Sequence, residues 1–205
     1  VAFFITASDK GDWFTGRFVY HGDALSGLAD VRSAPMRGSD GQPLAAKGWF
    51  DTESLTFDGS IAYVGIERVN KIVRFDFDKG GILARAEEVA APPEVAKLPY
   101  NLGLESLVYV GKGQRLAGTL LAISERSLDT DGNIAAFLIG GPSPGIFHIK
   151  RSNDFDISDA TLLPTGDVLL LERKFSLAKG VGIQVRCIPV STIAPDSLVD
   201  GPVLF

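Results

Sequence analysis

The chain has 205 residues, of which 45% are hydrophobic and 22% charged, and its formal net charge at pH 7 is −5. This composition excludes disorder, and the absence of a long basic run gives no electrostatic footprint for nucleic acid or an anionic membrane. No apolar run approaches the roughly 20 residues that a membrane-spanning helix needs. The 23 Gly and 11 Pro residues are spread along the chain, which favours many short strands over a few helices.

The opening segment, residues 1–20, predicts an apolar strand, the charged pair Asp9-Lys10 and a further strand from Arg17 to Tyr20. It resembles the later units of the chain but lacks their first strand. Because the sequence starts within a strand and without Met, and stops on the apolar GPVLF, we expect it to be part of a longer chain.

Three later segments repeat one order of features: an acidic residue, a short apolar strand, a Gly-containing turn, a second apolar strand and then Glu-Arg. They begin at DTESLTFDG, GLESLVYVG and SDATLLPTG, and they end with the pairs Glu67-Arg68, Glu125-Arg126 and Glu172-Arg173. A further strand follows each pair. The insertions DTDGNIAAFLIGGPSP and SLAKG precede two of these strands and predict loops on one face of the repeat.

Such units cannot bury their faces alone, so the repeat predicts a single all-β domain over residues 1–205, a β-propeller of four-stranded antiparallel blades. Repeats near residues 1–50, 51–100, 101–155 and 156–205 give about four blades. We expect these to belong to a larger, six-bladed propeller. Pro92-Pro93 excludes a long helix in that region and leaves a short helical turn at about residues 93–97.

Equivalent strand ends of a propeller meet near its axis, which predicts a ring of carboxylates and arginines. Carboxylates gathered there repel one another unless a cation joins them, and their hard oxygen ligands suit Ca²⁺ or Mg²⁺ better than Zn²⁺. The candidate catalytic residues are Glu67, Arg68, Glu105, Glu125, Arg126, Glu172 and Arg173, and the candidate metal ligands are Asp51, Glu53, Glu105 and Asp159. The sequence leaves open a purely structural ring, in which each Glu pairs with an Arg of a neighbouring blade.

Other motifs point to little additional chemistry. Residues 128–133, LDTDGN, match the start of an EF-hand loop but lack its final acidic residue, so an ordinary hairpin insertion is the alternative. Asn101 either adds an amide to the site or forms a turn that enters the next strand. No G-x-S-x-G elbow is present, His21 and His148 alone could serve as imidazole bases, and Cys187 lies in an apolar strand. No Gly-rich nucleotide loop is present, and we expect no organic cofactor.

Five motifs together resemble, in their order and over nearly the whole chain, the phytase-like propeller family, often described as having esterase-like activity of phytase. They are WFDTESLTFDG, YVGIERVNKIVRFDF, LPYNLGLESLVYV, LLAISERSLDTDG and DATLLPTGDVLLLERKFS. The resemblance implies a likeness to calcium-dependent propeller hydrolases. Members are usually longer at both ends and often carry a secretion leader, so it also implies a periplasmic or secreted protein.

These observations together predict a metal-dependent hydrolase whose partner is a small-molecule ester or phosphoester. The cation would activate water and neutralise developing charge, while an arginine orients the ester. The alternative is a propeller without catalytic activity that binds a ligand or a protein through its inserted loops, with the Glu-Arg pairs as structural ion pairs.

Overall fold

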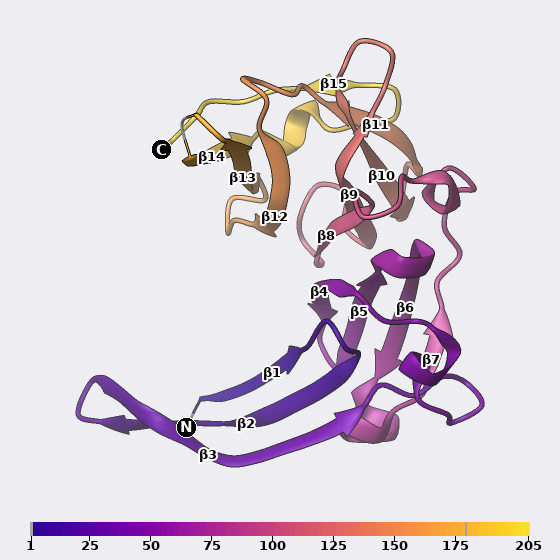
Figure 1. Cartoon of the computed structure of the whole chain (residues 1–205), viewed down its shortest axis with the longest axis vertical. Helices are drawn as coiled ribbons and strands as arrows, with labels where there is room; N and C mark the ends of the chain where they lie inside the picture. The colour runs from indigo at the N-terminus through magenta and orange to yellow at the C-terminus, as the bar shows by residue number, and fades with distance from the viewer. Residues whose placement is uncertain (1, 179) are drawn as a thin grey trace.

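Strands and short 3₁₀ helices make up the regular structure in a computed structural model that describes residues 2–178 and 180–205. No α-helix occurs in these residues, so the expected all-β class is confirmed. The strands form four sheets that follow one another along the chain and lie on an open arc (Figure 1). Within the described residues the arc does not close into a ring.

The four sheets are made of consecutive strands, with one late addition to the third. The first contains β1 (Phe3–Ala7), β2 (Asp12–His21) and β3 (Ala24–Pro35). The second contains β4 (Thr52–Asp58), β5 (Ile61–Ile66), β6 (Lys71–Asp76) and β7 (Ala86–Glu88). The third contains β8 (Leu104–Tyr109), β9 (Thr119–Leu128), β10 (Ile134–Gly140), β11 (Gly145–Ile149) and β15 (Leu198–Val199). The fourth contains β12 (Asp156–Leu162), β13 (Val168–Ser176) and β14 (Gly180–Ile188).

Within residues 2–178 and 180–205, six 3₁₀ helices lie in the connections. They are η1 (Leu44–Lys47), η2 (Glu67–Val69), η3 (Phe77–Lys79), η4 (Gly81–Leu83), η5 (Val95–Lys97) and η6 (Val190–Thr192). The helical turn expected near residues 93–97 is η5. None of the helices in the described part of the chain has the length and apolar character needed to cross a membrane.

Strand number differs between the sheets, and only the second has the expected four strands. The third gains β15, which pairs in parallel with β11. The C-terminal residues then return to the fourth sheet, where Cys187 N–H donates to Pro202 O (3.1 Å) and Leu204 N–H donates to Val185 O (2.8 Å). The last residues of the chain therefore act as an irregular outer strand on β14 and tie the third and fourth sheets together.

The hydrophobic core lies between consecutive sheets, in three clusters. Trp13 of the first sheet meets Phe75 of the second edge to face, with ring centroids 5.1 Å apart. Tyr63 of the second sheet stacks on Tyr109 of the third at 5.4 Å. A third cluster, in the third and fourth sheets, contains Leu170. Each sheet thus buries an apolar face on its neighbour, which is how a repeated unit that cannot stand alone obtains a core.

The first strands of the last three sheets lie side by side along the inside of the arc. Tyr109 N–H of β8 donates to Thr56 Oγ1 of β4 (3.2 Å), and Ser106 Oγ of β8 donates to Asp159 Oδ1 of β12 (3.4 Å). Near its start each strand has one residue without a partner in its ladder, as in a β-bulge: Glu53, Glu105 and Ser158. The three sheets therefore share a register that brings equivalent positions together at one end.

A buried ion pair holds the fourth sheet. Glu172 of β13 is fully buried, and Arg186 of β14, which is 1% exposed, donates to its carboxylate at 2.5 and 3.1 Å. Gln184 Nε2 donates to the same carboxylate at 2.7 Å. Arg186 also donates to Asp200 Oδ1 and Lys150 O, both at 2.8 Å. The guanidinium thus joins β13, β14 and the segment that follows β15 to the end of the third sheet.

Replacing Glu172 by Ala should lower the free energy of unfolding by about 3 kcal/mol or more, because it leaves the Arg186 charge buried without its main partner. Guanidinium unfolding measures this. The control is Arg173→Ala, which removes an exposed charge at the next position and should cost less than about 1 kcal/mol. Equal losses in the two variants would contradict a structural role for the Glu172–Arg186 pair.

Candidate functional site

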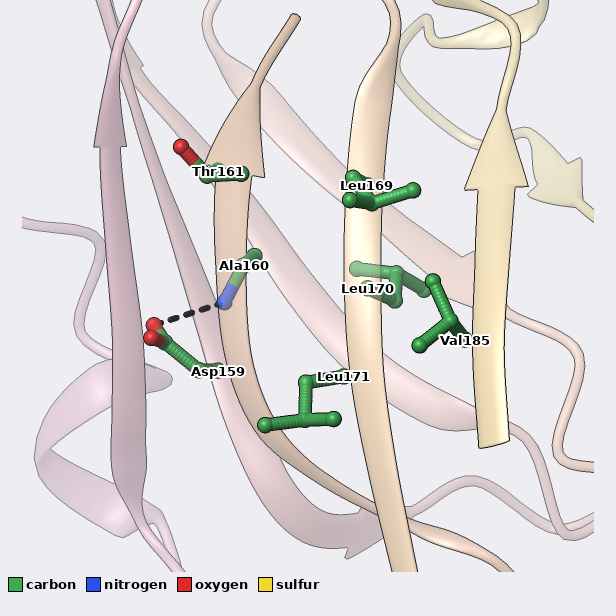
Figure 2. A pocket seen from close by; sticks show the side chains of 7 residues that line it. All are labelled: Asp159, Ala160, Thr161, Leu169, Leu170, Leu171 and Val185. Atoms are coloured by element: carbon green, nitrogen blue, oxygen red, sulfur yellow. Dashed lines mark hydrogen bonds between the residues drawn. The ribbon is translucent and has the colours of Figure 1, made fainter. Parts of the chain in front are cut away.

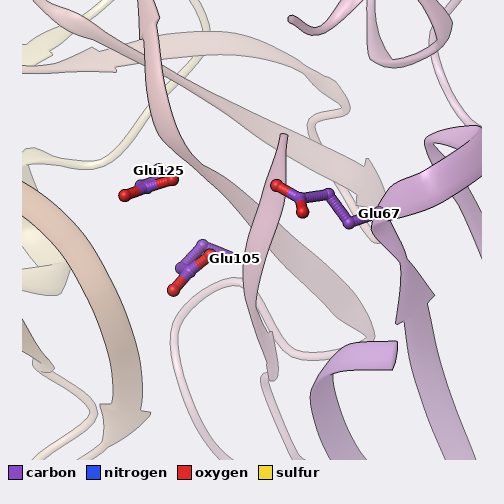
Figure 3. Close-up of side chains that lie close together, drawn as sticks. All are labelled: Glu67, Glu105 and Glu125. Carbon is purple, nitrogen blue, oxygen red and sulfur yellow. The ribbon is translucent and has the colours of Figure 1, made fainter. Parts of the chain in front are cut away.

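Three glutamates from neighbouring segments bring their carboxylates together (Figure 3). Glu67 lies in η2, Glu105 in β8 and Glu125 in β9, and one oxygen of each lies within 4.8 Å of the others. Glu67 is buried, and the other two are half-buried. We call these three residues the carboxylate cluster.

The repeat places two of the three side chains. Glu67 N–H donates to Asp51 O, and Glu125 N–H donates to Gly103 O, both at 2.9 Å. Glu67 and Glu125 therefore occupy the same position in the second and third sheets, one residue after the partner of the residue that precedes the bulge. Glu105 is the unpaired bulge residue between them, and a bulge redirects its side chain out of the regular alternation.

Glycine at position 103 fixes the orientation of Glu67. The N–H of Gly103 donates to Glu67 Oε1 at 2.8 Å, inside the protein. A Cβ atom at this position would lie 2.3 Å from Asn70 Oδ1, so no larger residue fits without displacing Asn70. The close approach of this backbone to η2 holds the Glu67 carboxylate toward the cluster.

Crowding of negative charge perturbs the cluster. Burial, followed by the charges of Glu125 and Glu53, raises the pKa of Glu105 to about 8. Burial and then the charge of Asp156 also raise the pKa of Glu125, against the opposing effect of Arg173. Without a cation, Glu105 is therefore largely protonated at neutral pH.

Two of the four residues proposed as metal ligands from the sequence, Asp51 and Glu53, border the cluster. Glu53 is exposed at its bulge, and partial desolvation followed by the charges of Asp9 and Asp51 raises its pKa. Asp51 adopts a left-handed backbone with φ of 68°, and its N–H donates to Asp9 O at 2.6 Å. Glu105 alone of the four belongs to the carboxylate cluster.

Asp159, the fourth of those residues, lies elsewhere. Its carboxylate accepts from the N–H of Ala160 at 2.7 Å (Figure 2). It also accepts from Ser106 Oγ at 3.4 Å. It borders a small, mainly apolar cavity of about 160 Å³ on the fourth sheet, with Leu169 and Leu171 among the lining residues. Its contacts join β12 to β8.

Glu172 is not brought into the carboxylate cluster. The reason is that the Glu-Arg pair of β13 lies one residue earlier, relative to the bulge of its partner strand, than the Glu-Arg pairs of the second and third sheets. The residue just before the bulge pairs with Ile66 in the second sheet, with Ser124 in the third and with Glu172 in the fourth. Glu172 thus corresponds to Ile66 and Ser124. A shift of one residue turns a strand side chain to the opposite face, and Glu172 accordingly points into the buried ion pair with Arg186.

The same shift puts Arg173 in the position that Glu67 and Glu125 hold in the preceding sheets. Its Nη2 lies 3.8 Å from Glu125 Oε1, and its side chain is 60% exposed. The third sheet contributes a second cation, Arg126, whose Nη1 lies 3.2 Å from Asp156 Oδ2. Two arginines therefore lie beside the Glu125 end of the carboxylate cluster.

Arg68 takes no part in this arrangement. Its guanidinium lies over the rings of Phe50 and Tyr100, 5.1 and 5.0 Å from their centroids, and donates to the Tyr100 hydroxyl. These cation–π contacts tie η2 to the loops on either side. Of the three Arg residues in the repeated pairs, Arg126 and Arg173 lie near the carboxylates.

A cavity of about 670 Å³ opens beside Glu125 and adds residues that the sequence pattern missed. Its lining residues are Glu125, Arg126, Arg151, Asp154, Asp156, Arg173, Lys174, Phe175 and Val181. Asp156 pairs with Arg173, so it corresponds in the repeat to Asp51 and Gly103. Asp156 would have been found from the sequence if the repeats had been aligned on the bulge residue and not on the Glu-Arg pair.

The remaining motifs lie outside the cluster. Asp129 accepts hydrogen bonds from the N–H groups of Asp131 (2.9 Å) and Asn133 (2.8 Å), which close the hairpin loop between β9 and β10. These contacts agree with the hairpin interpretation of LDTDGN. Asn101 is exposed in a left-handed turn with φ of 59°. Burial raises the pKa of Cys187, which disfavours a thiolate nucleophile.

The chain belongs to the phytase-like family described as "Esterase-like activity of phytase", whose family model matches residues 2–201. No curated protein sequence matches it. One similar solved structure is that of a Bacteroides uniformis protein provisionally described as a 6-phosphogluconolactonase, at 14% identity and a TM-score of 0.31. That alignment covers 98% of this chain and 72% of the other. A likeness this distant supports no argument about function.

Stability in the presence of a chelator should fall as the pH rises from about 5 to 8. The pKa of Glu105 is about 8 in the folded protein and near 4.5 in the unfolded chain, so the folded state binds more protons in this window. After allowance for solvent access, the loss should be on the order of 1–2 kcal/mol. Urea unfolding across the pH range measures it.

Glu105→Gln should flatten this slope, whereas Glu87→Gln, which changes an exposed glutamate paired with Arg74, should leave it intact. A slope that survives Glu105→Gln would show that another group carries the uptake of protons.

Proposed function

We propose that the protein is a metal-dependent hydrolase of small-molecule esters or phosphoesters, with Ca²⁺ or Mg²⁺ held by Glu67, Glu105 and Glu125. The observation that carries this proposal is the gathering of three carboxylates of which, in the part of the chain that the structure describes, only Glu125 has a cationic partner, Arg173. Three carboxylates lie within 4.8 Å of one another, and the pKa of one is raised to about 8. Among the described residues, Glu67 and Glu105 take part in no ion pair.

The donor set fits a hard divalent cation. It consists of carboxylate oxygens without His or Cys, which suits Ca²⁺ and Mg²⁺ and disfavours Zn²⁺. Two oxygens bound to one Ca²⁺ at about 2.3–2.6 Å can be up to about 5 Å apart, so the spacing needs little adjustment. A bound cation would supply Lewis-acid polarisation of the ester and a lowered pKa for an attacking water.

The chain's own residues would orient the reactants. Glu67 is held in place by the N–H of Gly103. Burial, followed by the charges of Glu125 and Glu53, raises the pKa of Glu105, and a bound cation would lower that pKa again by stabilising the carboxylate, so Glu105 would release its proton on binding. Arg173 is exposed beside Glu125 and would offer donors to an anionic group of the substrate in the adjoining cavity.

The rival hypothesis of a purely structural ring requires the glutamates and arginines of the repeated pairs to close on one another. In the described structure Glu67 accepts from a backbone N–H, Arg68 stacks on aromatic rings, and Glu172 pairs with Arg186, which belongs to none of the repeated Glu-Arg pairs. The 3.8 Å approach of Arg173 to Glu125 is the nearest to such a contact. These contacts favour an open site.

We extend the proposal to the architecture. The four sheets would be consecutive blades of a single β-propeller domain, part of a larger six-bladed ring in a periplasmic or secreted protein. The face-to-face packing of successive sheets and the inner row of β4, β8 and β12 support this arrangement.

The test is hydrolysis of p-nitrophenyl phosphate, phytate and p-nitrophenyl acetate by the purified protein, with added Ca²⁺ or Mg²⁺ and with EDTA. We expect activity on at least one ester that EDTA removes and the cation restores. Glu105→Gln should lower kcat by about a hundredfold, because it removes one of the three carboxylates that would hold the cation.

Glu87→Gln is the control and should retain full activity. Calorimetric titration with the cation alone should show binding that Glu105→Gln weakens. Hydrolysis that resists EDTA, or its absence across the panel in a protein that is folded by circular dichroism, would refute the metal-hydrolase proposal.

A further inference from the structure

Among the residues that the structure describes, the first sheet lacks the inner strand that the repeat provides in the other three sheets. In the second, third and fourth sheets, β5, β9 and β13 each pair with an inner strand, β4, β8 or β12. β1 corresponds to β5, because each is followed by a short turn that carries a charged pair, Asp9-Lys10 or Glu67-Arg68, before the next strand. In the described residues, however, β1 pairs only with β2.

The backbone of β1 is oriented for a second partner. Phe18 N–H donates to Ala2 O (2.9 Å) and Ser8 N–H donates to Asp12 O (3.0 Å), so the even-numbered residues are those bonded to β2. Antiparallel bonding alternates along a strand, and the N–H and C=O groups of Phe3, Ile5 and Ala7 therefore point to the opposite edge. An unpaired edge of this kind is a template for strand addition.

Exposed apolar side chains lie next to this edge. A cavity of about 490 Å³ lies across one face of the first sheet, between its three strands and the η3–η4 segment, with Phe3, Ile5 and Phe77 among its lining residues. Phe3 is 75% exposed and Ile5 is 38% exposed. Side chains of an added strand would find a partly apolar surface there.

The order of the inner strands β4, β8 and β12 also places the next strand at the free edge of β1. β12 lies beside β8, and β8 lies beside β4. The start of β4 is joined to the end of β1 by the N–H of Asp51, which donates to Asp9 O at 2.6 Å. The next place in the row is therefore the free edge of β1.

We infer that the free edge of β1 binds an extended peptide segment as an antiparallel inner strand. The interfaces β4–β5 and β8–β9 define its chemistry: an acidic bulge residue, a serine and then alternating apolar residues, as in residues 51–58 (DTESLTFD) and 103–110 (GLESLVYV). Bound in this register, its bulge residue lies close to Asp9 and extends the row that contains Glu53 and Glu105.

The experiment adds a synthetic peptide with the sequence of residues 51–58, and separately one with that of residues 103–110, to the protein and follows backbone amide hydrogen exchange. Exchange at Phe3, Ile5 and Ala7 should slow by about tenfold or more, while the amides already bonded to β2 change little. At least one of the two peptides should produce this pattern.

Two controls separate strand pairing from other binding. A peptide N-methylated at alternate residues keeps its side chains but cannot pair, and it should give no protection. Ile5→Pro removes an N–H from the free edge without removing a bond to β2, and it should abolish the effect of the unmethylated peptide.

The inference is overturned if neither peptide slows exchange at saturating concentration, or if the methylated peptide protects equally well. Protection of the same amides that increases with protein concentration, without peptide, would identify a second copy of the chain as the occupant and would also overturn it.

Discussion

The structure depends on one constraint, which is that each sheet must bury an apolar face against the next. Trp13 on Phe75 and Tyr63 on Tyr109 are local expressions of it. Because β4, β8 and β12 lie side by side and carry a bulge at the same place, stacking the sheets also stacks their ends. The proximity of Glu67, Glu105 and Glu125 is therefore a consequence of core formation.

At those ends the packing of the sheets is favourable, but it brings carboxylates into an unfavourable environment. The packing that stabilises the sheets draws carboxylates out of water and toward one another, which raises the pKa of Glu105 to about 8. A bound cation therefore stabilises the folded protein, whereas ionised carboxylates at this site without a cation destabilise it. Elsewhere the protein has resolved the same conflict by pairing, as the fully buried Glu172 shows with Arg186.

The all-β class could be predicted from the sequence. The repeat predicted a larger ring of carboxylates that also included Asp51, Glu53, Asp159 and Glu172, and of that ring the structure brings Glu67, Glu105 and Glu125 within 4.8 Å of one another. The sequence did not reveal that Glu172 turns away, because the letters Glu-Arg are identical in all three copies. Register is set by the turns, at residues 59–60 in one hairpin and 163–167 in another. The stacking of Arg68 on Tyr100 was equally hidden, since it depends on a loop 32 residues away.

Arg173 shows what this difference in register produces. Three nearly equivalent sheets would, if perfectly regular, surround their common end with one kind of charge and offer a ligand no preferred direction. The arginine in the fourth sheet breaks that quasi-symmetry. It gives the site an electrical polarity, so that an asymmetric ligand with a cation at one end and an anion at the other has a single favourable orientation.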